Sequence, residues 1–289
     1  MTNLYTKKDG IASFSLAVVM YIFMQLVLGS VILNLPTQSF AYNFLYAVLS
    51  ASIFAIAFLY AKITQKPFLT TTKATTKPQL WHILWGCLAT LGLIHLMLPL
   101  NELFFDLLES WGLNRPSTEM DLHPVALVIA TVIIAPIGEE FLFRGTIGNG
   151  LTNHNALGGI FANGALFALF HLNPAQTLHQ FVLGSFLMLL AYRSSSVWTS
   201  VIVHAFNNLA VILLSYTVEP SGFYQNHGVL AGIVGGVVFV GGVVGYMLTT
   251  KNHATQPAEK QQPNSGTWVA FAFAIAICVF LWVANLFVE

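Results

Sequence analysis

The run Ala135-Pro-Ile-Gly-Glu-Glu-Phe-Leu-Phe-Arg-Gly145 places two carboxylates and a guanidinium in a stretch that is otherwise apolar enough to cross a bilayer. An ionisable side chain at the centre of a spanning helix costs on the order of 2.5–3.5 kcal/mol, even on the insertion scale with the lowest values. Glu139, Glu140 and Arg144 therefore need a pairing or a chemical reason to lie there. The run predicts a membrane-spanning helix that carries a functional site.

The composition of the whole chain also indicates a membrane protein. Of 289 residues, 56% are hydrophobic and 8% are charged, whereas soluble domains carry about 25% charged residues. The formal net charge of +0 provides no basic field for a nucleic acid, so no nucleic-acid partner is expected. Cys87 and Cys278 each lie in an apolar segment, which indicates neither a disulfide framework nor a zinc cluster.

Nine apolar segments follow one another along the chain, bounded by polar residues, glycine or proline. They lie at about 11–33, 41–61, 80–100, 125–147, 156–171, 178–192, 197–217, 229–247 and 268–288. Most approach the ~20 residues that a spanning helix needs, but the fifth and sixth are nearer ~15, and we expect them to form a hairpin that turns inside the membrane. The sequence therefore predicts an all-α fold, a polytopic membrane helical bundle of about eight to nine transmembrane segments with a central four-helix catalytic core.

The charges between the segments predict an orientation. With a cytoplasmic N-terminus, the cytoplasmic side holds nearly all basic residues: Lys7, Lys8, Lys62, Lys66, Lys73, Lys77, Arg193, Lys251 and Lys260. Arg115 is the only basic residue on the other, mainly acidic side. This asymmetry predicts a multi-pass protein of the cell membrane with its N-terminus in the cytoplasm. Residues 101–111 mix apolar and acidic side chains, so a short interfacial helix and a solvated loop are both open.

Three charged residues in one helix can be sorted by helical spacing. Residues four positions apart share a face, while adjacent residues diverge by about 100°. Glu140 and Arg144 are therefore expected to be partners. Glu139 lies on a neighbouring face, where it is free to act on something else. The alternative is that both acids only satisfy Arg144.

Two more pairs with this spacing occur in later segments, Phe167 with His171 and His204 with Asn208. A lone intramembrane histidine is more often structural than catalytic, but a carboxylate and two histidines on separate helices favour convergence on one site. An asparagine one turn from a histidine places an amide donor beside the imidazole, and this pairing suits an oxyanion. Other histidines in apolar segments are interpreted as structural or interfacial: His82, His95 and His179.

The strings Glu139-Glu140-Phe-Leu-Phe-Arg144, Phe167-Ala-Leu-Phe-His171 and His204-Ala-Phe-Asn-Asn208 resemble, in order and spacing, the EExxxR, FxxxH and HxxxN motifs of the CPBP family of CAAX proteases and bacteriocin-processing proteins. The resemblance covers about residues 124–214. It implies an intramembrane endopeptidase in which Glu139 and His171 activate a water for attack on a peptide carbonyl. His204 and Asn208 would stabilise the oxyanion. The implied structural support comes from Glu140, Arg144 and Phe167.

Other functions use the same residues. Glu139, His171 and His204 could supply the three protein ligands of a zinc protease, but the chain lacks His-Glu-x-x-His, and a mechanism without a cofactor is preferred. A non-catalytic scaffold or immunity protein of the bacteriocin self-immunity type would keep the motif as a buried ion-pair network. A transporter is less favoured, because no two halves of the chain have matching broken segments.

The predicted organisation has three parts. Residues 1–122 hold N-terminal transmembrane helices and an acidic loop, residues 123–217 the catalytic core, and residues 218–289 the C-terminal transmembrane helices. The expected partners are the lipid bilayer and a membrane-associated peptide or protein substrate. The family resemblance leaves open a prenylated CAAX protein or a peptide in bacteriocin maturation or immunity.

The eighth segment is unusually rich in glycine. Gly232 and Gly236 have Gly-x-x-x-Gly spacing, as do Gly241 and Gly245. Small residues with this spacing let two helices approach closely. We therefore predict a helix-packing face here, with a homo-dimer as one way to use it.

Overall fold

The computed structural model describes residues 4–116, 121–153, 155–218, 221–250 and 261–287, and every regular element in these ranges is a helix. The long helices are α1 (Lys7–Ile32), α2 (Phe40–Ile63), α4 (Leu80–Ser110), α8 (Ala156–Phe170), α9 (Thr177–Ser194), α10 (Val197–Thr217), α11 (Phe223–Thr249) and α12 (Ser265–Ala284). Two short helices, α3 (Phe68–Thr71) and η3 (Pro174–Gln176), lie in connections. The predicted all-α helical bundle is confirmed.

The fourth apolar segment is one continuous helical path with two π-helical stretches. It consists of α5 (Pro124–Val128), η1 (Ile129–Ile134), α6 (Ala135–Glu140), η2 (Phe141–Gly148) and α7 (Asn149–Thr152). The backbone N–H of Ala135 donates to the carbonyl of Ala130, five residues earlier. Pro136 follows and has no N–H, so it cannot donate to Thr131 in the same register. The wide helix therefore leaves the Thr131 carbonyl to a partner from elsewhere.

Seven helices in the described residues are long and apolar enough to cross a membrane. They are α1, α2, α4, the path from Pro124 to Thr152, α10, α11 and α12. Helix α8 is apolar but has 15 residues, and α9, with 18, is not among the seven. The protein is thus a multi-pass membrane protein. The nine predicted segments correspond to these seven helices and the shorter α8–α9 pair.

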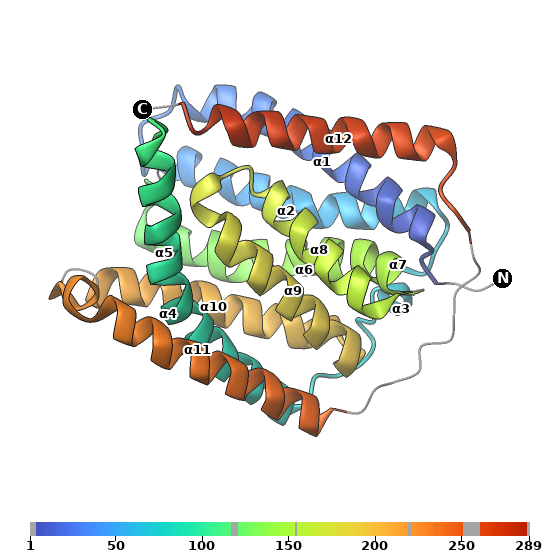
Figure 1. Ribbon diagram of the computed structural model, residues 1–289. Coiled ribbons are helices and arrows are strands. Elements are labelled where there is room, and N and C mark those ends of the chain that lie inside the picture. Colours follow the sequence, from blue (N-terminus) through green and yellow to red (C-terminus); the bar gives the residue numbers. More distant parts are fainter. Residues whose placement is uncertain (1–3, 117–120, 154, 219–220, 251–260, 288–289) are drawn as a thin grey trace.

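The helices form three layers (Figure 1), with α1, α2 and α12 on one side, α4 and α11 on the other, and the path of α5 to α7 with α8, α9 and α10 between them. One apolar cluster, which includes Phe143 and Phe167, joins the middle layer to α1, α2 and α12. A second, which includes Leu187 and Tyr246, joins α9 and α10 to α4 and α11. The four predicted core segments are therefore covered on both sides. The division at residues 122 and 217 stays a prediction.

Helix α4 holds Pro99 in its interior, and the later part of the helix runs crosswise to the other helices (Figure 1). A proline ring inside a helix clashes with the preceding turn and removes a backbone donor. In the crosswise part, Phe105 and Leu108 are buried, while Leu103 and Leu107 are exposed. Residues 101–110 thus form a helix with a buried face, and the solvated-loop alternative is wrong.

The glycine-rich face of α11 packs against α4 within the same chain. A Cβ on Gly235 would lie 2.6 Å from the carbonyl oxygen of Gly92, and one on Gly242 would lie 2.7 Å from the backbone nitrogen of Ala89. At Gly241 a Cβ would meet nothing within 4 Å. Close packing explains most of this glycine pattern, and the homo-dimer stays a prediction.

Candidate active site

Glu140 and Arg144 form a buried ion pair on the fourth helical path. Nη1 of Arg144 lies 3.0 Å from Oε1 of Glu140, and both side chains are 0% exposed. Nη2 of Arg144 donates to the carbonyl of Gly184 on α9 at 3.2 Å, and the guanidinium lies 4.2 Å from the ring centroid of Phe167 on α8. Arg144 therefore joins η2 to both helices of the hairpin. The pair that the i, i+4 spacing predicts is present.

His204 lies between the two neighbouring carboxylates. Its Nδ1 is 2.8 Å from Oε1 of Glu140, and its Nε2 is 3.8 Å from Oε2 of Glu139. The Glu139 side chain is 14% exposed, whereas that of Glu140 is fully buried. Glu140 thus contacts both Arg144 and His204, although spacing along the sequence predicts only the first partner. With Nδ1–H donating to Glu140, the opposite edge of the ring faces Glu139.

His171 and His204 meet through the ring of Phe167. Nδ1 of His171 lies 2.8 Å from the carbonyl of Phe167, one turn earlier. The Phe167 ring centroid is 4.6 Å from that of His171 and 5.8 Å from that of His204. Glu139 lies within coulombic range of the His171 ring. Phe167 is therefore a wall shared by the two predicted catalytic histidines.

Asn208 supplies the donor that the π-helical stretch lacks. Its Nδ2 donates to the carbonyl of Thr131 at 2.8 Å, the group that Pro136 cannot reach. Its Oδ1 accepts from Nδ2 of Asn207 at 3.2 Å. The amide nitrogen of Asn208 has two protons, and one of them is used in the hydrogen bond to Thr131. The predicted role of Asn208 in binding the oxyanion therefore depends on the second proton.

Asn207 and His179 adjoin the site and were not among the predicted site residues. Asn207 is 2% exposed, and its side chain neighbours that of His179. The His171 and His204 rings both lie within coulombic range of His179. The interpretation of His179 as structural or interfacial stays a prediction. A signal for Asn207 was present, because it lies three residues after His204 and shares its helical face.

The zinc alternative can be compared with the geometry of the same side chains. Among the described residues, no three His, Cys, Asp or Glu side chains form a group that could hold a metal ion. Glu139 and His204 face each other, but the arrangement with His171 does not make such a group. The absence of a metal cofactor stays a prediction.

Residues 121–210 match the model of the protein family described as Rce1-like, the type II CAAX prenyl endopeptidases. This segment belongs to the Rce1-like family. No curated protein and no solved structure matches the chain. The Rce1-like segment contains all of the residues from Glu139 to Asn208 that form the site. The prediction of the family is confirmed, and it is a family of CAAX-type intramembrane endopeptidases. The roles of single side chains stay predictions.

Proposed function

We propose that this protein is an intramembrane endopeptidase that hydrolyses a peptide bond near the C-terminus of a prenylated, CAAX-type membrane-associated protein. The observation that supports this best is the partly open Glu139 carboxylate, which faces His204 in the Rce1-like segment, with His171 one aromatic ring away. A buried ion pair alone would need Glu140 and Arg144. It would not need a second carboxylate aimed at a histidine.

In the proposed mechanism Glu139 accepts a proton from a water that His171 orients. The resulting hydroxide attacks the carbonyl carbon of the scissile bond, and the carbonyl electron pair moves to the oxygen. His204 and Asn208 donate hydrogen bonds to this oxyanion. When the C–N bond breaks, the protonated Glu139 returns its proton to the leaving amine, and the carboxylate is ready for another cycle.

Glu140 has a positioning role in this proposal. The hydrogen bond that Glu140 accepts from Nδ1 fixes the ring orientation of His204. This orientation directs Nε2 at the space beside Glu139, where the oxyanion would form. Donors that are already in place at a developing oxyanion contribute about 2.7–4 kcal/mol each to lowering the barrier.

The test is cleavage of a prenylated CAAX peptide by the purified protein and its Glu139→Gln variant. The amide keeps the shape and removes the base, so turnover should fall by roughly 100–10,000-fold with the unfolding temperature unchanged. Glu109→Gln, at a 50% exposed acid on α4, is the matched control. Turnover retained in Glu139→Gln would reject Glu139 as the base. A wild-type protein that cleaves no membrane-associated peptide would favour the scaffold or immunity alternative.

The same purified protein distinguishes the metal-free mechanism from a zinc-dependent one. Without a metal, exhaustive chelation should leave the rate unchanged, and elemental analysis should find far less than one zinc per chain. If zinc is bound instead, loss of one ligand should lower metal affinity by about 10–100-fold or more. Stoichiometric zinc, with activity lost on chelation and restored by added metal, would replace the metal-free mechanism and leave the protease function in place.

A further inference from the structure

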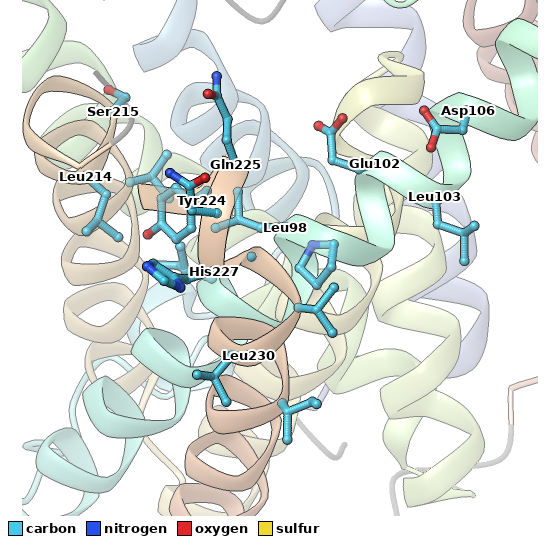
Figure 2. Close-up of a pocket in the computed structure, with 17 residues that line it drawn as sticks. Leu98, Glu102, Leu103, Asp106, Leu214, Ser215, Tyr224, Gln225, His227 and Leu230 are labelled. Atoms are coloured by element: carbon cyan, nitrogen blue, oxygen red, sulfur yellow. The ribbon is translucent and has the colours of Figure 1, made fainter. Parts of the chain in front are cut away.

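A large cavity lies outside the catalytic constellation, beside Pro99 of α4. Its volume is about 970 Å³, and α4, the end of α10 and the first part of α11 enclose it (Figure 2). None of the predicted catalytic residues lines it. The volume lies at the upper end of the range of about 300–1,000 Å³ that ligand pockets occupy.

All three helices change from apolar to polar toward the same end of this cavity. On α4 the lining passes from Ile94 and Leu98 to Glu102 and Asp106, and on α10 from Val211 to Ser215. On α11, which runs in the opposite direction, polar residues come first: Gln225, Asn226 and His227 precede Val229, Leu230 and Ile233. Figure 2 shows the two carboxylates at one end and Leu230 at the other. The cavity thus has a polar mouth above an apolar base.

This gradient follows the gradient of a bilayer. The apolar base belongs to helices that are long enough to cross a membrane, and the mouth lies beside the crosswise part of α4. Leu230 and Ile233 are each 62% exposed, so the base is open toward the surrounding lipid. A molecule that enters from the membrane would place its chain in the base and its head in the mouth.

The mouth carries negative charge, and one of its two acids has no lysine or arginine partner among the residues that the structure describes. Arg115 binds Glu102 with both Nη atoms, each 3.0 Å from a carboxylate oxygen. Asp106 forms no ion pair with a lysine or arginine in the described part of the chain, and Arg115 is the only basic residue between α4 and the fourth helical path. A cationic headgroup complements this mouth, whereas an anionic one is repelled.

We propose that this cavity binds one phospholipid whose headgroup carries a primary ammonium group. The ammonium lies on the carboxylate of Asp106, and the phosphate lies toward the Gln225 amide and the His227 ring. The upper parts of the acyl chains lie against Leu98, Leu230 and Ile233. This lipid site is independent of the endopeptidase proposal.

Native mass spectrometry of the purified protein with added phosphatidylethanolamine, phosphatidylcholine or phosphatidylglycerol tests the headgroup. One phosphatidylethanolamine per chain should be retained in preference to either other lipid. Asp106→Asn removes the charge and keeps the shape, so retention should weaken by roughly two- to fivefold, the effect of an exposed ion pair of up to about 1 kcal/mol. Glu109→Gln makes the same charge change on the same helix outside the cavity and should leave retention unchanged.

The apolar base has its own pair of variants. Leu230→Trp fills the base and should lower retention of phosphatidylethanolamine, whereas Val237→Trp, at a 70% exposed position of α11 outside the cavity, should not. Retention of phosphatidylglycerol equal to that of phosphatidylethanolamine, or equal losses in Asp106→Asn and Glu109→Gln, would overturn the proposal. So would displacement of the lipid by a prenylated peptide, which would make the cavity a substrate site, or a dimer that buries the cavity.

Discussion

Glu140 is the side chain on which the arrangement of the site depends. It accepts contacts from Arg144 at 3.0 Å and His204 at 2.8 Å, so it fixes α10 against the fourth helical path. Spacing on one helix identified the Arg144 contact. The His204 contact joins residues 64 positions apart, and no spacing rule links positions so distant. Sequence therefore identified which side chains are functional candidates better than it identified how they touch.

Removing either member of the buried pair should destabilise the protein. Glu140→Ala leaves the Arg144 guanidinium buried without its carboxylate, and Arg144→Ala leaves the Glu140 carboxylate buried without its guanidinium. Each change should therefore lower the free energy of unfolding by about 3–5 kcal/mol. Thermal unfolding in a fixed detergent, followed by circular dichroism, measures the loss. Glu109→Ala, which breaks an exposed pair with Arg115, is the control and should cost at most about 1 kcal/mol. Wild-type stability in both buried-pair variants would show that the pair does not form.

Asn207 should act as a positioning residue for Asn208. Its Nδ2 donates to Oδ1 of Asn208, which keeps Nδ2 of Asn208 directed away from it and toward Thr131. Asn207→Asp replaces the donor with an acceptor and should turn the Asn208 amide. We expect kcat to fall by roughly 10–100-fold with KM unchanged, less than the 100–1,000-fold loss expected for removing the oxyanion donor in Asn208→Ala.

Steady-state kinetics on the prenylated peptide measure this effect. Asn207→Gln keeps a donor amide and should recover part of the rate. A purely structural role would instead lower the amount of folded enzyme and leave kcat per folded molecule unchanged. That outcome, or a change in KM alone, would contradict the positioning role.

At the scale of elements, apolar periodicity located the helices well and missed their irregularities. The tenth helix, Val197–Thr217, coincides with the predicted segment. The fourth apolar segment, from Pro124 to Thr152, contains two π-helical stretches. Hydrophobicity does not reveal them, because a π-helical stretch buries the same kind of residue as an α-helix. Pro136 was a visible signal, since its missing N–H accounts for the carbonyl that Asn208 binds.

The α8–α9 hairpin is another point where simple geometry fails. At ~1.5 Å per residue, straight helices would leave His171 about 22 Å from the cytoplasmic end and His204 about 10 Å from it. In the structure both rings contact Phe167, and α8 and α9 lie obliquely in the bundle (Figure 1). A Cβ on Gly184 would lie 3.1 Å from Cα of Gly164, so glycines let the two helices cross closely. Tilt depends on such packing and cannot be obtained from segment lengths.

The α4–α11 contact makes a prediction about single glycines. Gly235→Ala would place a methyl group 2.6 Å from the Gly92 carbonyl and 2.7 Å from the Leu96 nitrogen, so backbone atoms must move. We expect a loss of about 1–3 kcal/mol, as for overpacking in a core. Gly241→Ala on the same helix meets open space and should be neutral or slightly stabilising, because alanine favours helix. Equal unfolding temperatures for both variants would show that α4 does not pack against Gly235.

At the scale of the whole molecule, the structure separates the charges by end. The last turn of α2 and the connections from α2 to α4 carry four lysines: Lys62, Lys66, Lys73 and Lys77. The crosswise part of α4, at the other end of the bundle, carries acids: Glu102, Asp106 and Glu109. Because basic residues flanking spans remain in the cytoplasm, the lysine-bearing end and the N-terminus should face inward. The lipid site beside Asp106 would then face the outer leaflet.

Cysteine labelling in intact cells tests this orientation. Thr75 precedes α4 and Ser110 is its last residue, and both are exposed. The native thiols lie in apolar helices, where Cys278 is fully buried and Cys87 partly so. Ser110→Cys should react with a membrane-impermeant maleimide in intact cells. Thr75→Cys should react only after the membrane is permeabilised, and the unmodified chain gives the background. Because α4 crosses the membrane between the two positions, labelling of both in intact cells would contradict its crossing. Labelling of Thr75→Cys but not of Ser110→Cys in intact cells would show that the protein has the opposite orientation. The acidic mouth and its lipid would then lie in the cytoplasmic leaflet, with every contact within the bundle unchanged.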